Sequence, residues 1–212
     1  MLDWIQRRLL GRAADARGAA SAFPGMRRQL ASTHDRIVDA FSMALELREP
    51  ELRVLDHSAR VGIVADHIAA EMGVPEGDRY ILHTAAQLHE VGMLTLPSEL
   101  VGRPGPLTRT EVEAVRGQAR VSALLARVGY HPRVARLIED QYTDFGDLLA
   151  RPALAEADLL LSGIFRVADV FASVTWPRPY QDPMRPERRA MLLRGGAGTR
   201  FEPLAVSAAL AL

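Results

Sequence analysis

Two histidines and two carboxylates are the residues of this sequence best suited to metal chemistry. His57 opens an apolar stripe at helical spacing, while His89 and Glu90 end an apolar stretch just before a glycine. Asp169 lies in the segment 159–174, which is apolar on nearly every side. Imidazole and carboxylate together suit Mn, Fe, Zn or Mg. Because a buried carboxylate without a partner is costly, Asp169 is expected to meet a cation or several hydrogen-bond donors.

Each of these residues also has a purely structural interpretation. Arg166 lies three residues before Asp169, and an ion pair at this spacing would satisfy the buried carboxylate. His89 and Glu90 could be a helix-terminal pair, and His57 could be a structural histidine near a helix start. Taken singly, the four residues leave both a metal site and a structural role open.

The composition excludes several chemistries. All 26 basic residues are arginine and the acidic residues also number 26, so the net charge is +0. No overall field draws the chain towards nucleic acid or an anionic membrane, and we expect no nucleic-acid partner. The lack of lysine excludes Schiff-base chemistry. The lack of cysteine excludes disulfides, thiolate metal sites and cysteine nucleophiles.

The elements that must position the four residues are predicted to be helices, and the fold class is predicted to be all-α. Apolar residues recur at helical spacing along most of the chain, and strand signals are few. A helix capped by Asp78 is predicted to run to about Glu90. Thr108 and Glu111 form a predicted capping box for a helix that runs through Val128.

Two segments between the helices are predicted to be loops. The segment 91–106 is rich in glycine and proline, and the segment 147–157 surrounds Pro152. The first of them follows His89 and Glu90 directly, and loops beside helix ends are common places for ligands. The segment 159–174 is predicted to be a central buried helix.

The chain is predicted to comprise an N-terminal region, 1–25, and a helical domain, 26–212. The N-terminal region begins as a basic amphipathic helix and continues into a linker rich in alanine and glycine. We expect this helix to bind a protein partner or to mediate self-association, and a peripheral membrane contact is the alternative. No apolar run approaches the roughly 20 residues that span a bilayer. We therefore expect no transmembrane segment, no signal peptide and a cytoplasmic location.

Five segments together resemble the HD-GYP branch of the HD superfamily of metal-dependent phosphohydrolases. They read DHSARVGIVADHIAAEMGVP, AAQLHEVGMLTLP, GRPGPLT, RVADVFASVTWPRPY and GGAGTRFEP. The order of His57, His89-Glu90 and Asp169 is similar to the H…HD…D order of the superfamily. The resemblance runs from about Phe41 to Leu212. It implies a helical bundle of the kind that hydrolyses cyclic di-GMP with bridging metal ions.

The chain departs from the pattern of this branch at several positions. Glu90 stands where the branch has an aspartate, and Met93 stands where it has a lysine. Three histidine positions of the branch fall at Gln118, Gln141 and Tyr142, which we interpret as lost ligand positions. The Gly-Tyr-Pro segment that names the branch is absent. The resemblance therefore implies a degenerate member.

The retained residues limit what such a site would hold. The resemblance implies that His57, His89, Glu90 and Asp169 hold either no metal or one divalent ion, which would be Mn, Fe, Zn or Mg. Arg178 matches an arginine of the branch that resembles a nucleotide-contacting group, so it is the candidate substrate-binding residue. A salt bridge between loop and helix is the alternative for Arg178. No residue is assigned a catalytic role.

Two functions follow from the resemblance. The first is a catalytically degenerate HD-GYP-like domain, acting as a regulatory or interaction module in cyclic dinucleotide signalling, with a nucleotide as a candidate ligand. The alternative is a single-metal HD-type phosphohydrolase that acts on a nucleotide or another phosphoester. Because the loss of several cooperating groups multiplies in rate, we do not expect cyclic di-GMP hydrolysis at a rate typical of the branch.

Overall fold

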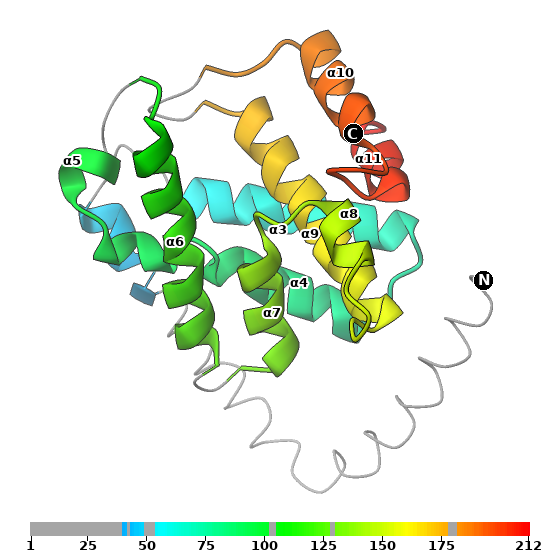
Figure 1. Ribbon diagram of the computed structural model, residues 1–212, viewed down its shortest axis with the longest axis horizontal. Helices are drawn as coiled ribbons and strands as arrows, with labels where there is room; N and C mark the ends of the chain where they lie inside the picture. The colour runs from blue at the N-terminus through cyan, green and yellow to red at the C-terminus, as the bar shows by residue number, and fades with distance from the viewer. Residues whose placement is uncertain (1–39, 42, 49–53, 102–104, 128–129, 178–181) are drawn as a thin grey trace, which may run out of the picture. The chain divides into compact units, whose positions relative to one another are not determined.

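The described part of the chain is helical (Figure 1). The computed structural model describes residues 40–41, 43–48, 54–101, 105–127, 130–177 and 182–212. Phe41–Leu212 forms one compact unit. Within the described residues, the only β-type pairing is an isolated bridge between Ala197 and Phe201. The predicted all-α class is confirmed.

The helices follow one another through short connections. In chain order they are α3 (Val54–Glu71), α4 (Glu76–Leu88), the 3₁₀ helix η2 (Val91–Thr95), α5 (Ser98–Val101), α6 (Arg109–Ala126), α7 (Pro132–Asp140), α8 (Phe145–Leu149), α9 (Glu156–Thr175), α10 (Pro186–Gly196) and α11 (Pro203–Ala209). In Figure 1, α9 crosses α3 near the middle of the unit, and α6 and α7 lie side by side.

Helix α9 is the central helix, as its apolar sequence predicts. It packs against α3 and also contacts α4, α7, α8, α10 and α11. Ile164 and Phe165 of α9 are fully buried, as are Ile68 of α3 and Leu82 of α4. Burying a large apolar side chain contributes about 1.5–3 kcal/mol. This shared core holds α3, α4 and α9, which carry the candidate metal ligands, in fixed relative positions.

An arginine bridge joins three helices and corrects one predicted cap. Helix α4 begins at Glu76 with Pro75 as its N-cap, so Asp78 lies inside the first turn and does not cap the helix. The carboxylate of Asp78 instead accepts a hydrogen bond from Arg133 of α7. The Nε of Arg133 donates to Asp158 of α9 at 2.5 Å. Tertiary packing has thus given Asp78 a partner that local sequence does not indicate.

The two predicted loops contain short helices. The segment 91–106 includes η2 and α5, and the segment 147–157 begins inside α8. Helix α8 is held by contacts distant in the sequence. The backbone N–H of Gly146 donates to the carbonyl of Thr199 at 2.7 Å, and Leu148 is buried. Because these contacts are tertiary, the local glycine and proline pattern does not reveal the helix.

The capping box at the start of α6 is confirmed. The Thr108 side chain accepts from the backbone N–H of Glu111, and the Glu111 carboxylate accepts from the backbone N–H of Thr108. The helix ends at Ala126, two residues before the predicted end, with Arg127 as its C-cap. A capping box acts within one helical turn, which is why its effect could be predicted from the sequence.

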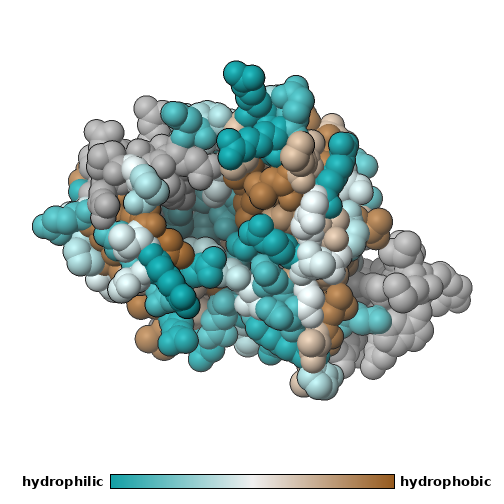
Figure 2. Space-filling model, turned by 45° about the horizontal axis from the view of Figure 1, so that its top comes forward, coloured by the Kyte–Doolittle hydropathy of each residue, from teal (hydrophilic) through white to brown (hydrophobic). Residues whose placement is uncertain are grey.

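Some predictions concern residues outside the described part of the chain. These are the amphipathic helix and linker predicted for 1–25 and the substrate-binding role predicted for Arg178. Where the chain is described, no helix combines the length and apolarity that crossing a membrane requires. The face of the molecule in Figure 2 carries a hollow with a hydrophilic floor and hydrophobic atoms on both sides.

Candidate metal centre

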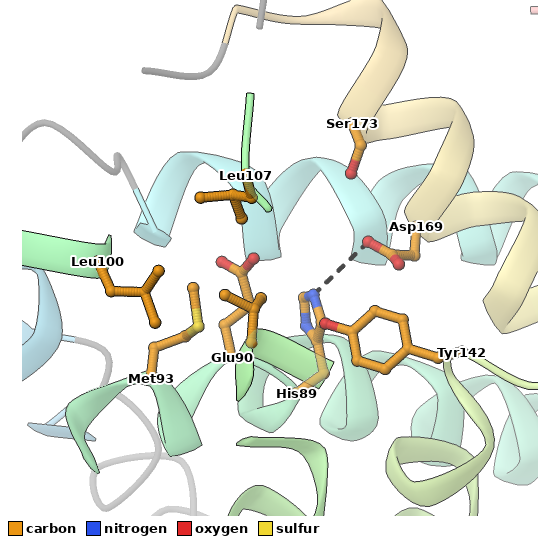
Figure 3. Close-up of a pocket in the computed structure, with 9 residues that line it drawn as sticks. His89, Glu90, Met93, Leu100, Leu107, Tyr142, Asp169 and Ser173 are labelled. Carbon is orange, nitrogen blue, oxygen red and sulfur yellow. Dashed lines mark ion pairs between the residues drawn. The ribbon is translucent and has the colours of Figure 1, made fainter. Parts of the chain in front are cut away.

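Three helices bring His57, His89 and Asp169 together. His57 lies on α3, His89 is the C-cap residue of α4 and Asp169 lies on α9. The Nε2 atom of His57 is 3.3 Å from Oδ1 of Asp169 and 3.3 Å from Nε2 of His89. His89 Nε2 lies 3.8 Å from the same carboxylate oxygen (Figure 3). All three residues are buried, with 4%, 1% and 8% of their surface exposed.

These separations fit the coordination shell of a single metal ion. Ligand atoms about 2.0–2.2 Å from a tetrahedral ion lie about 3.3–3.6 Å from one another. The three ligand atoms here all lie within 4.8 Å of one another. No other group of three histidine or acidic residues does so in the part of the chain that the structure describes. Two imidazoles and one carboxylate are a donor set that suits a divalent transition metal.

The ring of His89 is held in the tautomer that a metal ligand needs. Its Nδ1 lies 2.7 Å from the carbonyl oxygen of Ala86. Because a carbonyl oxygen only accepts hydrogen bonds, Nδ1 carries a proton, and Nε2 is the ring atom that faces His57 and Asp169. A hydrogen bond within the last turn of α4 therefore prepares this ring for coordination.

Asp169 is held in its ionised form by its neighbours. Burial alone would raise the pKa of this carboxyl group, but the hydrogen bond with His57 and the nearby charges of His89 and Arg166 outweigh burial. The net effect is a pKa well below the usual range. An ionised buried carboxylate beside two imidazoles is ready to accept a cation.

The predicted ion pair between Arg166 and Asp169 is not the arrangement that forms. Arg166 Nη1 donates to the carbonyl of Gln141 at 3.0 Å, and its Nη2 lies 3.8 Å from Asp144. The ion-pair partners of Asp169 are His57 and His89. Asp169 acts on the Arg166 guanidinium through its charge, without a direct ion pair. Burial lowers the pKa of Arg166.

Glu90 lies at the edge of this group. It follows His89 directly and is the N-cap residue of η2. One of its carboxylate oxygens is 3.8 Å from Nε2 of His57, but Glu90 does not belong to the set of ligand atoms within 4.8 Å of one another. The structure thus brings together all four residues predicted as metal ligands, with three in contact and Glu90 beside them.

Gln118 and Gln141, two of the three positions that the sequence resemblance assigns to ligands, turn their amides to the backbone of His89. Nε2 of Gln118 donates to the His89 carbonyl at 3.0 Å, and Nε2 of Gln141 donates to it at 3.4 Å. The hydroxyl of Ser122, on α6, lies 3.1 Å from the same oxygen and 2.9 Å from Oε1 of Gln118. Three polar side chains therefore converge on one carbonyl at the end of α4.

Gly92 makes this arrangement possible. Its backbone N–H donates to the hydroxyl of Ser122 at 2.7 Å. A Cβ atom at this position would overlap the carbonyl oxygen of Gln118 and would lie 2.9 Å from its carbonyl carbon. Only a residue without a side chain lets η2 approach α6 this closely. The sequence pattern placed Gly92 in a loop but did not show what it approaches.

Tyr142 occupies the third lost ligand position. Its hydroxyl lies 3.5 Å from Nε2 of Gln118, and the guanidinium carbon of Arg116 lies 5.8 Å from the centre of its ring. The neighbouring Gln141 keeps its Oε1 buried, without a hydrogen-bond partner among the described residues. The phenol thus faces the cavity beside the metal ligands, where it offers a hydroxyl in place of an imidazole.

The other described histidines lie away from this centre. His131 is the N-cap residue of α7, and His67 and His83 line a separate cavity with Asp66. None of them belongs to the group of three. A second ion beside the first would therefore find no further imidazole within the described part of the chain.

A cavity of about 180 Å³ opens beside the metal ligands (Figure 3). Its lining residues are His89, Glu90, Met93, Leu100, Leu107, Val115, Tyr142, Asp169 and Ser173. Sequence reasoning missed Ser122, Ser173 and the leucines of this cavity. Only Ser122 could have been found from its spacing. It follows Gln118 by four residues, the spacing at which side chains on a helix meet.

Three curated proteins illustrate the similarity. The chain is 26% identical over 169 residues to "3'3'-cGAMP-specific phosphodiesterase 3" of Vibrio cholerae serotype O1, over 79% of this chain and 36% of the relative. It is 28% identical over 180 residues to "Cyclic di-GMP phosphodiesterase" of Thermotoga maritima, over 83% and 48% of the two chains. It is 28% identical over 155 residues to "Cyclic di-GMP phosphodiesterase response regulator RpfG" of Xanthomonas campestris pv. campestris, over 71% and 41%.

The chain spans less than half the length of each of these three relatives. The sequence model described as "HD domain" matches residues 39–204, which include every candidate ligand described above. This match covers most of the chain, and it confirms the superfamily that the sequence motifs predicted. The chain belongs to the HD domain family.

Proposed function

We propose that this chain is a degenerate HD domain that binds at most one divalent metal ion and serves as a regulatory module in cyclic dinucleotide signalling. It would not hydrolyse cyclic dinucleotides as its relatives are named to do. The observation that carries this proposal is the orientation of Gln118 and Gln141. Both direct an N–H donor at the carbonyl of His89.

Both the nitrogen and the oxygen of the Gln118 side-chain amide have hydrogen-bond partners. Its Nε2 donates to His89, and its Oε1 lies 2.9 Å from the hydroxyl of Ser122. A metal ion needs a lone pair, and an amide N–H group has none to offer. Phosphodiester hydrolysis by paired metal ions needs a second ion about 3.5–4 Å from the first. At one of the positions proposed for such a ligand, the Gln118 side chain is instead hydrogen-bonded to the backbone of His89 and to Ser122.

The first ion retains its ligands in this proposal. His57, His89 and Asp169 would hold it, and Glu90 lies close enough to support the site. A single divalent ion supplies positive charge that attracts and polarises an anionic ligand. His57 and His89 contribute neutral donors, while Asp169 offsets one unit of the metal charge. This centre therefore favours binding of an oxyanion.

Metal stoichiometry and hydrolysis, measured on the same preparation, test the proposal. Chelator-treated protein is titrated with Mn²⁺ by calorimetry, and cyclic di-GMP turnover is followed by chromatography. We expect one Mn²⁺ per chain and no turnover above that of the buffer. Asp169→Asn should abolish Mn²⁺ binding. Asp66→Asn is the matched control, because Asp66 pairs with Arg79 on the surface and lies outside the group.

Two results would contradict the proposal. Two bound ions per chain would show that the glutamines do not block a second site. Cyclic di-GMP turnover that is lost in Asp169→Asn but kept in Asp66→Asn would show a working phosphodiesterase. Absence of any Mn²⁺, Zn²⁺ or Fe²⁺ binding would remove the metal from the proposed function.

A single-metal phosphohydrolase is the second candidate function. It is favoured by the position of Glu90, whose carboxylate is 3.8 Å from His57 and lines the cavity. A carboxylate placed there could take a proton from an attacking water. Metal-dependent turnover of p-nitrophenyl phosphate that falls at least a hundredfold in Glu90→Gln would support this candidate over the regulatory one. Absence of metal-dependent turnover in the wild type would exclude it, and equal turnover in the wild type and Glu90→Gln would show that Glu90 takes no part.

A further inference from the structure

The cavity beside the metal centre divides into a polar and an apolar half. Figure 3 shows Asp169, Ser173 and Tyr142 on one side of His89. Met93 and Leu100 lie on the other side, where the carboxylate of Glu90 borders them. Leu107 and Val115 complete the apolar half of the lining. A ligand that fits both halves must carry a polar head and an apolar body.

We propose that this cavity binds a small phosphomonoester whose organic part is one compact apolar group, such as an aromatic ring. The proposal rests on the single-metal centre proposed above, because the metal would hold the phosphate. The ring would lie against Met93, Leu100, Leu107 and Val115. A ligand of this class differs from a cyclic dinucleotide in size and in the number of its phosphate groups.

The size of the cavity supports a ligand with a single ring. Its volume is about 180 Å³. An engineered apolar cavity of about 150 Å³ binds benzene, whereas sites for drug-sized ligands span about 300–1,000 Å³. A cyclic dinucleotide carries two nucleobases, two riboses and two phosphates, which this volume cannot enclose. One ring with its phosphate next to the metal is the better match.

The charge of the lining supports a single anionic head. Glu90 and Asp169 are the ionisable acids of the cavity, and none of the described lining residues is an arginine. Without a metal ion these two carboxylates repel an anion. With one ion, a single phosphate can be held, and Tyr142 and Ser173 have hydroxyls on that side of the cavity to donate to its oxygens. A second phosphate would find no charge to pair with among these residues.

The apolar half is built into the fold. Met93 is only 5% exposed, and it packs in a cluster with Leu45 and Val101 that Val115 also joins. The thioether of methionine makes favourable contacts with aromatic rings. Because the branch resembled in sequence has a lysine at the position of Met93, this chain presents an apolar surface where a cation would otherwise face the ligand.

Calorimetry on the Mn²⁺-loaded chain tests the inference with three probes: phenyl phosphate, inorganic phosphate and cyclic di-GMP. Phenyl phosphate should bind at least tenfold more tightly than inorganic phosphate, because its ring removes apolar surface from water. A tenfold ratio corresponds to about 1.4 kcal/mol. Cyclic di-GMP should bind more weakly than phenyl phosphate. Chelator should abolish the binding of phenyl phosphate.

Variants of the apolar half separate ring binding from phosphate binding. Val115→Ser should weaken phenyl phosphate about fivefold and leave inorganic phosphate unchanged, because it alters only the surface against the ring. Leu107→Ser, in the connection before α6, is a second variant in case the first does not fold. Leu124→Ser is the control, since Leu124 lies on α6 but is 62% exposed and does not line the cavity.

The outcomes distinguish this inference from the proposed function. Equal affinity for phenyl phosphate and inorganic phosphate on a chain that binds one Mn²⁺ would overturn the inference alone. Tighter binding of cyclic di-GMP than of phenyl phosphate would also overturn it. A chain that binds no divalent metal would overturn the inference and leave a regulatory module without a metal, whereas cyclic di-GMP turnover that depends on Asp169 would contradict the proposed function.

Discussion

The imidazole ring and the backbone carbonyl of His89 are surrounded by different chemical groups. On the ring side, an imidazole nitrogen of His57 and a carboxylate oxygen of Asp169 lie 3.3 and 3.8 Å from its Nε2 atom. On the backbone side, Gln118 and Gln141 present amide donors to its carbonyl. The ring side can hold a cation, and the backbone side cannot. Gln118 and Gln141 therefore anchor the backbone of His89.

This difference teaches that a side chain beside a candidate metal ligand can position that ligand through its backbone. Hydrogen bonds to the backbone of a metal ligand fix the direction of its side chain, and outer partners of this kind typically affect metal affinity about 10–100-fold. The two sides of His89 are therefore coupled, although they use different chemistry. The predictions below separate them, in order of expected effect.

The largest expected effect comes from Gly92→Ala. The new Cβ would overlap the backbone of Gln118, and backbone atoms cannot move aside as a flexible side chain would. We expect the free energy of unfolding to fall by about 3 kcal/mol, measured by urea denaturation. Gly117→Ala on α6 is the control, because a Cβ there meets nothing within 4 Å. It should stabilise the chain by about 0.5–1 kcal/mol. Equal effects of the two variants would contradict the close approach of η2 to α6.

Metal binding is expected to stabilise the ring side. At a Mn²⁺ concentration one hundred times the Kd, the free energy of unfolding should rise by about 2.7 kcal/mol, because the ion binds only the folded chain. The rise should vanish on addition of chelator and should be absent in Asp169→Asn. A melting temperature that is the same with Mn²⁺ and with chelator would show that the ring side holds no metal.

Removing an anchor on the backbone side should have a smaller effect. Gln118→Leu leaves Ser122 without one of its partners and removes a donor from the His89 carbonyl, which should cost about 2 kcal/mol of stability. Mn²⁺ affinity should fall about tenfold, because the direction of the His89 ring is less well fixed. Calorimetry at matched pH measures the affinity.

Arg120→Leu provides the comparison for Gln118→Leu. Arg120 is exposed on the same helix, so its replacement should change stability by no more than about 0.5 kcal/mol. Unchanged Mn²⁺ affinity in Gln118→Leu would mean that the two sides of His89 are independent.

The smallest expected effect is on metal stoichiometry in Gln118→His. One restored imidazole does not supply the ligands that a second ion needs, because Gln141 and Tyr142 still occupy the other two positions. The number of Mn²⁺ ions per chain should stay at one, as measured by metal analysis after gel filtration. Two ions per chain in this variant would show that a single glutamine is all that excludes the second ion.

Features with a local cause could be predicted from the sequence. The capping box of Thr108 and Glu111 and the burial of α9 follow from spacing within a few residues, and both agree with the structure. Helix α8 was missed because its backbone hydrogen-bonds to Thr199, far along the chain. The cap assigned to Asp78 was wrong because its carboxylate found Arg133 on another helix.

The candidate ligands themselves could be named from the sequence, but their partners could not. Residue types and motif order selected His57, His89 and Asp169, and the fold places them in contact. The resemblance identified Gln118 and Gln141 as lost ligands, yet nothing in the sequence showed that both would donate to the carbonyl of His89. These hydrogen bonds join residues 29 and 52 positions apart.

The sequence by itself determined an all-α chain of the HD family with three candidate metal ligands, and it excluded cysteine and lysine chemistry. The tertiary structure decided the tautomer of the His89 ring, the role of the glutamines and the apolar half of the cavity. The physical reason is the range of the interactions. Helical periodicity and capping act within about one turn, whereas the metal centre exists only where three packed helices meet.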